Sequence, residues 1–179
     1  MRDAGCTILY GIGEMVMREQ YVGIRYNATG VSGYSFRKDG TEVFRVSCPV
    51  MPKPDILLSG FGKTLWHRNY DGQITLCPGV RRNVTDESGS VRGYYEIARL
   101  GEFFIVTESA RAYVRASEAG WHISTGGRLT AELLRLPENE RTRFSENGFD
   151  MEKRFRLNIL KGTDTSMIPC IMAIPLLGF

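Results

Sequence analysis

MIPCIMAIPLLGF, residues 167–179, closes the chain as thirteen successive residues without a charge. A helix that spans a bilayer needs ~20 apolar residues, so this stretch is too short to cross a membrane. Asp164 or Ser166 can cap a helix here by accepting a hydrogen bond from a free backbone N–H. Pro169 then lies in the first turn, where a missing N–H does no harm, and Pro175 stops the helix. We therefore predict a short apolar helix of about two turns.

This predicted helix has no polar face, because every position between its two prolines is apolar. A helix that is apolar all round must be enclosed on every side. In a chain otherwise made of strands, a closed barrel is one of the few structures that can enclose a single helix. We therefore predict a mainly β fold, in which a closed antiparallel β-barrel encloses residues 166–179 as a buried central helix.

Alternating apolar and polar side chains recur along the rest of the chain, as is typical of half-buried antiparallel strands. The clearest runs are Arg154–Ile159, Arg111–Ala116, Glu42–Val46 and Gln73–Leu76. Short turn signals separate the runs: Asp39-Gly40, Asp71-Gly72, Ser88-Gly89, Gly126-Gly127 and Asn147-Gly148. Such pairs provide the positive φ angles that tight hairpins require. Many short strands spaced by such turns predict a sandwich or a barrel.

The chain of 179 residues is long enough for one domain, so we predict a single domain over 1–179, with 1–16 as an extension outside the barrel. A net charge of +3 argues against a nucleic-acid partner, which usually requires a strong basic stripe. No signal peptide is visible, and this predicts a cytoplasmic protein. The four cysteines are then reduced thiols: Cys6, Cys48, Cys77 and Cys170.

Two glycine-containing stretches resemble nucleotide-binding motifs in part. Gly60–Thr64 matches the end of a phosphate-binding loop, but the first glycine of that motif is replaced by Leu57 and no helix is expected next. Gly11-Ile12-Gly13 lacks the third glycine of a dinucleotide fingerprint, and no βαβ unit follows. We interpret both stretches as turns or loops and predict no cofactor.

The two histidines, His67 and His122, have no cysteine or carboxylate at ligand spacing, so we predict no metal site. The nucleophile motif G-x-S-x-G is absent, and we predict no catalytic residue. Within Trp121–Ser124, we expect His122 to point outward from a strand whose tryptophan and isoleucine point inward. Four acidic residues are expected to face solvent: Glu42, Asp55, Glu96 and Glu132.

Clustered basic residues are the candidate binding groups: Arg81, Arg82, Arg111, Arg115, Lys153, Arg154 and Arg156. Arginines an even number of residues apart on a strand share a face, as in Arg154 with Arg156 and in Arg111 with Arg115, and can present two cations to one anion. We predict an anionic lipid headgroup or a phosphate as the ligand of such a site. The alternative interpretation is that these side chains solubilise and protect exposed strands, which the mild net charge favours.

The order of these elements resembles the tubby-like β-barrel superfamily, which includes tubby proteins, phospholipid scramblases and LURP-one-related proteins. The resemblance rests on the hairpins, the strand Phe155–Leu160, the turn Gly162–Asp164 and the final apolar helix, and it covers about residues 17–179. It implies a barrel around a hydrophobic C-terminal helix and, by analogy with tubby proteins, binding to phosphoinositide headgroups or a membrane surface. The palmitoylated cysteines and the calcium-binding segment of scramblases have no counterpart here.

Together these observations predict a non-enzymatic binding or scaffold module. One alternative is an enzyme or a small-molecule-binding barrel, which would have a ligand cavity at the barrel mouth. Another is a protein–protein interaction module that uses the proline-containing segment Ser47–Leu65.

Overall fold

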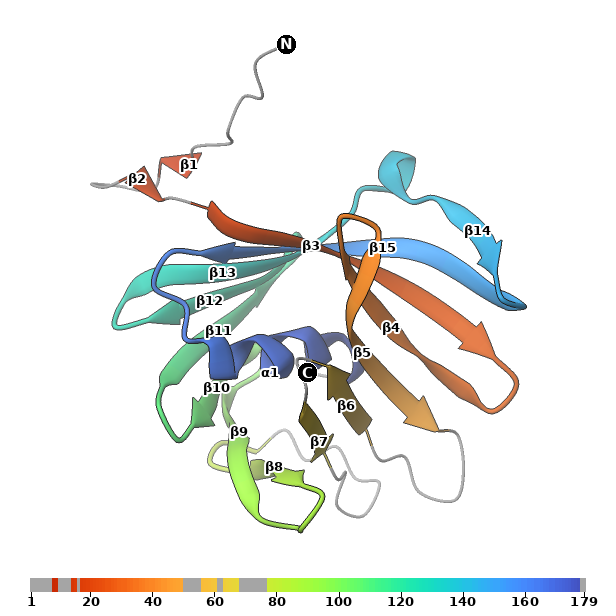
Figure 1. Cartoon of the computed structure of the whole chain (residues 1–179). Helices are drawn as coiled ribbons and strands as arrows, with labels where there is room; N and C mark the ends of the chain where they lie inside the picture. The colour runs from red at the N-terminus through yellow and green to blue at the C-terminus, as the bar shows by residue number, and fades with distance from the viewer. Residues whose placement is uncertain are drawn as a thin grey trace.

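The computed structural model describes residues 8–9, 14–15, 17–49, 56–60, 63–67 and 77–177, and the secondary structure in these ranges is mainly β (Figure 1). The strands are β1 (Ile8–Leu9), β2 (Glu14–Met15), β3 (Met17–Ala28), β4 (Val31–Lys38), β5 (Thr41–Pro49), β6 (Ile56–Gly60), β7 (Lys63–His67), β8 (Arg81–Asp86), β9 (Val91–Arg99), β10 (Glu102–Thr107), β11 (Arg111–Ser117), β12 (Gly120–Thr125), β13 (Arg128–Arg135), β14 (Arg143–Glu146) and β15 (Phe149–Leu160). The helical segments are η1 (Glu138–Glu140), η2 (Thr165–Met167), α1 (Ile168–Ala173) and η3 (Ile174–Leu176).

Tight hairpins connect most neighbouring strands. Asp39-Gly40 and Asn147-Gly148 both have positive φ at their two residues, as the two-residue turn of a hairpin requires. The strands predicted at Arg154–Ile159, Arg111–Ala116 and Glu42–Val46 are confirmed in β15, β11 and β5. The strand predicted at Gln73–Leu76 lies outside the described residues, as does most of the proposed extension 1–16.

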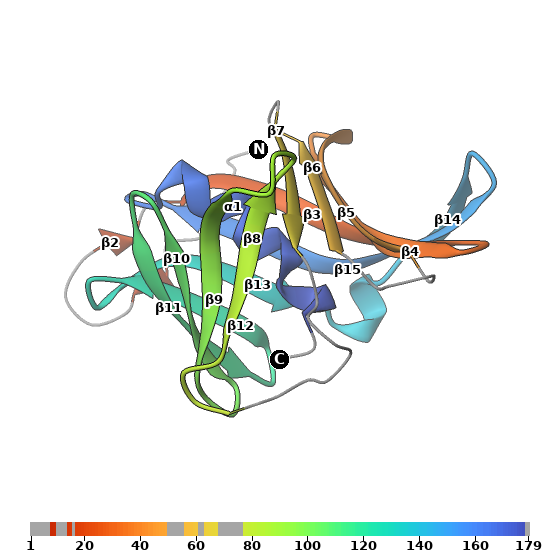
Figure 2. The same cartoon turned by 90° about the horizontal axis from the view of Figure 1, so that it is seen from below.

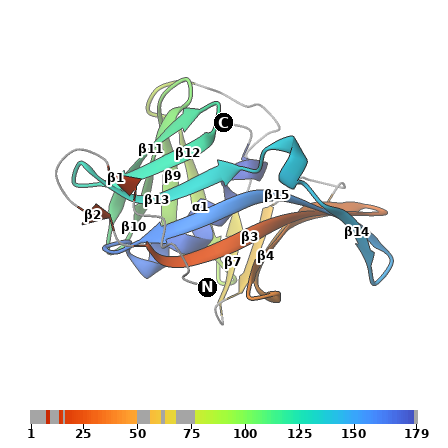
Figure 3. The same ribbon diagram turned by 90° about the horizontal axis from the view of Figure 1, so that it is seen from above.

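One antiparallel sheet of 13 strands contains β3 to β15, in the order β13-β12-β11-β10-β9-β8-β7-β6-β5-β4-β3-β15-β14. Strand β15 has β3 along one edge. Along its other edge, residues 149–152 pair with β14, and residues 155–159 pair with β13. Figure 3 shows β15 between β3 and β13 over one part of its length, with β14 beside the other part.

The closed barrel predicted from the sequence is therefore wrong. A uniform barrel needs a single neighbour along each edge of every strand, whereas this sheet is one large curved sheet that forks at β15. A bulge between Lys153 and Phe155 lies at the fork, and bulges bend a strand. The ends of β3, β4, β14 and β15 extend beyond the helix as a splayed ribbon (Figure 1).

The C-terminal helical segment lies against the concave face of the curved sheet, between strands β8–β11 and strands β3 and β15 (Figure 2). Its buried side chains are Met167, Ile168, Cys170, Ile171, Met172, Ala173, Ile174 and Leu177. They form one core cluster with inward-facing residues of the sheet such as Phe36, Phe103 and Leu157. The side chain of Asp164 caps the start of the segment by accepting a hydrogen bond from Ser166 N.

Two polar side chains from the sheet hold the backbone of this segment. The Tyr95 hydroxyl donates to the carbonyl oxygen of Cys170 at 2.7 Å, and Arg82 Nη1 donates to that of Leu177 at 2.6 Å. The last carbonyl groups of a helix have no partner within it, so such donors satisfy groups that burial would otherwise leave unpaired. The helix is thus fixed by hydrogen bonds from β8 and β9 as well as by apolar packing.

We predict that Ile171→Ala lowers the free energy of unfolding by about 2–5 kcal/mol, because the fully buried side chain leaves a cavity when truncated. Chemical denaturation measures this change. Leu100→Ala is the control, since Leu100 is 79% exposed and its truncation should change stability by less than about 0.5 kcal/mol. Equal effects of the two substitutions would contradict this account of the core.

We also predict that Cys170 resists thiol reagents until the protein unfolds. Burial raises the pKa of its thiol from 9.0 to about 11, which lowers the reactive thiolate fraction at about pH 8 roughly 100-fold. Exposed Cys77 should react rapidly with iodoacetamide in the native protein. Peptide mass spectrometry distinguishes the two sites, and equal native labelling of both would show that the helix is not buried.

Candidate functional site

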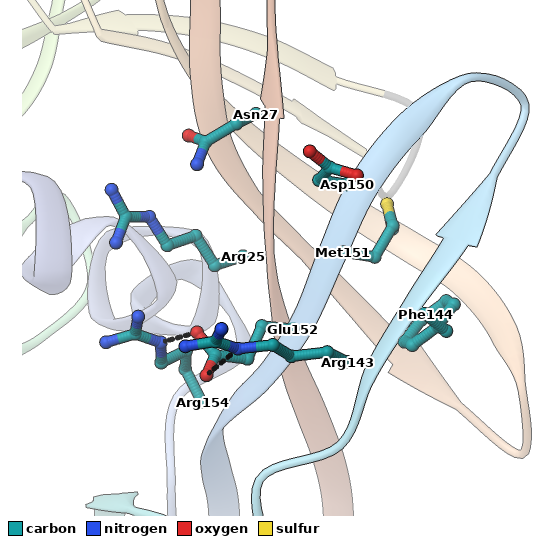
Figure 4. Close-up of a pocket in the computed structure, with 8 residues that line it drawn as sticks. All are labelled: Arg25, Asn27, Arg143, Phe144, Asp150, Met151, Glu152 and Arg154. Atoms are coloured by element: carbon teal, nitrogen blue, oxygen red, sulfur yellow. Dashed lines mark hydrogen bonds and ion pairs between the residues drawn. The ribbon is translucent and has the colours of Figure 1, made fainter.

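A cavity of 550 Å³ lies at the splayed end of the sheet, and we call it the arginine pocket (Figure 4). Its lining residues come from β3, β14 and β15: Arg25, Asn27, Arg143, Phe144, Asp150, Met151, Glu152 and Arg154. Arg25 follows Tyr21 and Gly23 on the same face of β3, so the pocket continues the concave face beyond the end of the core. Strand register places Glu152 directly opposite Arg25.

Glu152 is the central charge of the arginine pocket. Arg143 Nε donates to its Oε1 at 3.3 Å, and Arg154 Nε donates to its Oε2 (Figure 4). Partial burial raises the pKa of Glu152, but the hydrogen bonds from Arg154 and Arg143 outweigh this effect and leave the pKa below its usual value. The carboxylate therefore stays ionised and neutralises part of the charge of two arginines.

Arg25 provides a further positive charge in the same pocket. No hydrogen bond or ion pair joins its guanidinium to another residue within the described part of the chain. Figure 4 shows it pointing to the same side as the guanidinium groups of Arg143 and Arg154. Burial raises the pKa of the Tyr34 hydroxyl nearby, and the charges of Arg25 and Arg154 partly oppose this shift. Three arginines against Asp150 and Glu152 leave the pocket with a net positive charge.

Of the arginines singled out in the sequence, Arg81 and Arg111 lie together on the convex face. Both bind Glu96: Arg81 Nε is 2.6 Å from Oε2, and Arg111 Nη2 is 3.7 Å from Oε1. Each also stacks on an aromatic ring, Arg81 over Tyr94 at 4.5 Å and Arg111 over Phe104 at 4.1 Å. Their charge is thus shared with a carboxylate and two rings, so this pair is less available to a ligand than Arg25.

Arg82 and Arg115 belong to neither group. Arg82 alternates with Arg81 on β8, so it points inward, where it is 8% exposed and binds the C-terminal segment. Burial lowers the pKa of its guanidinium. Arg115 lies on the convex face of β11, with Nε 3.9 Å from Glu102 Oε1. The sequence pairs Arg81 with Arg82 and Arg111 with Arg115 therefore do not act as units.

The predicted cluster Lys153, Arg154 and Arg156 is divided by the bulge in β15. Arg154 lines the arginine pocket and binds Glu152, whereas Arg156 Nη2 lies 2.9 Å from Glu140 Oε2 on η1. Lys153 pairs in register with Ile24 and does not line the pocket. Of the seven candidate residues, only Arg154 lies in the arginine pocket.

Seven of the eight residues that line the pocket were not among the sequence candidates, and they include Arg25, Arg143 and Glu152. Arg25 lies within the strand-like stretch before the first hairpin, and its alternation with Tyr21 and Gly23 was the available signal. Arg143 lies in a polar stretch between β13 and β15. Its proximity to Arg25 depends on the pairing of β3, β14 and β15, which the sequence does not display.

The acidic residues fall into different environments. Glu132 is buried, so the prediction that it faces solvent is wrong. His122 and Asn158 lie beside it in the neighbouring strands and cover it. His122 does point outward while Trp121 and Ile123 are buried, as predicted. Asp55 lies outside the described residues. Among the described residues, no group of three His, Cys, Asp or Glu side chains is placed to hold a metal ion.

The glycine-containing motifs lie largely in undescribed parts of the chain. Gly60 ends β6, and Lys63 and Thr64 begin β7, so a strand follows where a phosphate-binding loop requires a helix. Gly11-Ile12-Gly13 and most of the loop part of Ser47–Leu65 lie outside the described residues. Across the described ranges, no helix has the length and apolar composition needed to cross a membrane.

Comparison with known proteins gives no neighbour from which a function could be inferred: no family model, curated protein or solved structure matches the chain. The resemblance to the tubby-like superfamily therefore stays a prediction.

Proposed function

We propose that this protein is a binding module whose arginine pocket holds a phosphate group, free or as part of a lipid headgroup, without chemical change to the ligand. The observation that carries this proposal is Arg25, whose guanidinium enters the pocket without an ion-pair partner in the described part of the chain. A planar guanidinium binds phosphate oxygens through two parallel hydrogen bonds.

Two further features of the arginine pocket support an anionic ligand. Arg143 and Arg154 meet at Glu152, so a phosphate that enters beside them can share their remaining N–H groups. Asn27 adds an amide that donates hydrogen bonds without a charge. The volume of 550 Å³ lies within the range of small-ligand sites and can hold a sugar phosphate or an inositol phosphate headgroup.

The resemblance to tubby-like proteins makes a phosphoinositide headgroup the first source of phosphate to test. A cytoplasmic location is part of the same proposal, because phosphoinositides face the cytoplasm. The alternative of a protein–protein interaction module that uses Ser47–Leu65 has no comparable structural support, because much of that segment lies outside the described residues.

We predict that Arg25→Ala weakens binding of inositol trisphosphate by about 10-fold or more, as expected for the loss of a charge-assisted hydrogen bond. Isothermal titration with the soluble headgroup measures the Kd. Flotation with phosphatidylcholine vesicles, with and without a phosphoinositide, shows whether a membrane-bound source is also bound. Binding to both sources should weaken as the salt concentration rises.

Arg128→Ala is the matched control, because it removes the same charge from an exposed position in the β12–β13 hairpin. It should leave the Kd nearly unchanged. Equal losses for the two variants would indicate a general charge effect and would contradict a specific pocket. No salt-sensitive binding of either phosphate source by the wild-type protein would refute the proposed function.

A second substitution should strengthen binding. Glu152→Gln keeps the shape of the side chain but removes the negative charge between Arg143 and Arg154, so both guanidinium groups become more available to an anion. We expect the Kd for inositol trisphosphate to fall by about 10-fold. Weaker binding would show that Glu152 organises the site and that the arginines act only as its partners.

A further inference from the structure

Ser117, His122 and Glu132 lie in a row on the convex face of β11, β12 and β13. Their strand neighbours Val114, Ile123 and Leu133 are fully buried, so alternation directs these three side chains away from the core. His122 pairs in register with Glu132 on one side and with Arg115 on the other. The row is outside the arginine pocket and shares no residue with it.

The distances connect the three groups into a chain. Ser117 Oγ is 3.3 Å from His122 Nε2, and His122 Nδ1 is 3.4 Å from Glu132 Oε1. The serine Oγ is also 3.3 Å from the carbonyl oxygen of Gly120, to which it can donate when it turns away from the histidine. Separations slightly above 3.2 Å are usual in sites without a substrate, because the hydrogen bonds tighten when the substrate binds.

Glu132 is the unusual member of the row, because its side chain is only 4% exposed and its Oε2 is buried without a hydrogen-bond partner. The other buried carboxylate on this face, Glu102, binds Arg99. Burial of an unpaired polar oxygen costs free energy. Among the described residues, His122 is the ionisable side chain in contact with this carboxylate. In the tautomer that carries its proton on Nδ1, His122 directs this N–H towards Glu132 Oε1, and the lone pair of Nε2 faces the Ser117 hydroxyl.

Arg115 supplies a positive charge beside this row. It lies two residues before Ser117 on the same face of β11 and directly opposite His122. Its side chain is 72% exposed, and its one ion pair within the described part of the chain is the 3.9 Å contact with Glu102. This exposed guanidinium can approach a negative oxygen that forms next to Ser117, which is the role of an oxyanion stabiliser.

We propose that Ser117, His122 and Glu132 form a hydrolytic relay that cleaves short carboxylic esters, an activity separate from the proposed binding function. Ser117 is the nucleophile and His122 the general base, whereas Glu132 is a positioning residue that fixes the histidine tautomer. Ser117 is exposed on a convex face, so the site suits an ester with a short acyl chain whose carbonyl group projects to the protein surface.

The reaction balances with water as the only co-reactant. Ser117 Oγ forms a bond to the ester carbonyl carbon while its proton passes to His122 Nε2, and Arg115 stabilises the negative carbonyl oxygen. The ester C–O bond then breaks, and the leaving alkoxide takes the proton from Nε2 and departs as an alcohol. Water attacks the acyl-serine, gives a proton to Nε2, and releases the carboxylic acid as Ser117 Oγ recovers that proton.

The full-length protein is tested with 4-nitrophenyl acetate. We expect acetylation of Ser117, located by peptide mass spectrometry, together with release of nitrophenol. His122→Gln should slow acetylation of Ser117 by about 100-fold, since a general base contributes at least this factor. Ser88→Ala is the matched control, because this exposed serine binds a carboxylate and not an imidazole, and the substitution should leave the rate unchanged.

Glu132→Leu separates a positioning role from a structural one. Nitrogen NMR of the two histidines should show His122 as the Nδ1–H tautomer in the wild-type protein and a shift towards the Nε2–H tautomer in the variant. Acetylation of Ser117 should slow by at least about 10-fold while the far-ultraviolet circular dichroism stays native. The proposal is overturned if Ser117 is not acetylated, if His122→Gln acetylates at the wild-type rate, or if the tautomer does not respond to Glu132→Leu.

Discussion

The fold depends on one constraint, which is that an apolar helix without a polar face must be covered on all sides. The sheet meets this constraint by curving, so that inward-facing side chains of β3–β5, β8–β13 and β15 form one core cluster with α1 and the short helices beside it. Arg82 and Tyr95 then satisfy the carbonyl groups that burial would leave unpaired. Each apolar residue buried in this way contributes about 1.5–3 kcal/mol, so the helix stabilises the sheet as much as the sheet encloses the helix.

The sequence predicted the local structure well, because local structure depends on neighbours in the chain. Alternation gave the strands around Phe155, Val114 and Phe44, and Asp39-Gly40 and Asn147-Gly148 gave the hairpins. The fork at β15 could not be predicted in this way. It depends on a bulge and on two different partners along one edge of a single strand, which are properties of the pairing and not of the sequence pattern.

The candidate sites were harder to predict than the fold for the same physical reason. Clusters along the chain suggested the arginines, but Arg81 and Arg82 point to opposite sides of the sheet, and Arg154 meets Arg143 and Glu152 only where the sheet forks. Glu132 was expected to face solvent because its neighbours across the sheet, His122 and Asn158, are distant in sequence. Ion pairs in a sheet form between residues on neighbouring strands, whereas the sequence shows only which charged residues are close along one strand.

The contact between α1 and strands β5 and β6 joins distant parts of the chain. Loop-closure entropy must be overcome before such a contact contributes any stability, which places this protein among the slow-folding β topologies. Until the helix docks, the apolar concave face of the sheet is open to water and the strands lack their common core. In any state in which the sheet has formed and the helix has not docked, self-association through this face competes with folding.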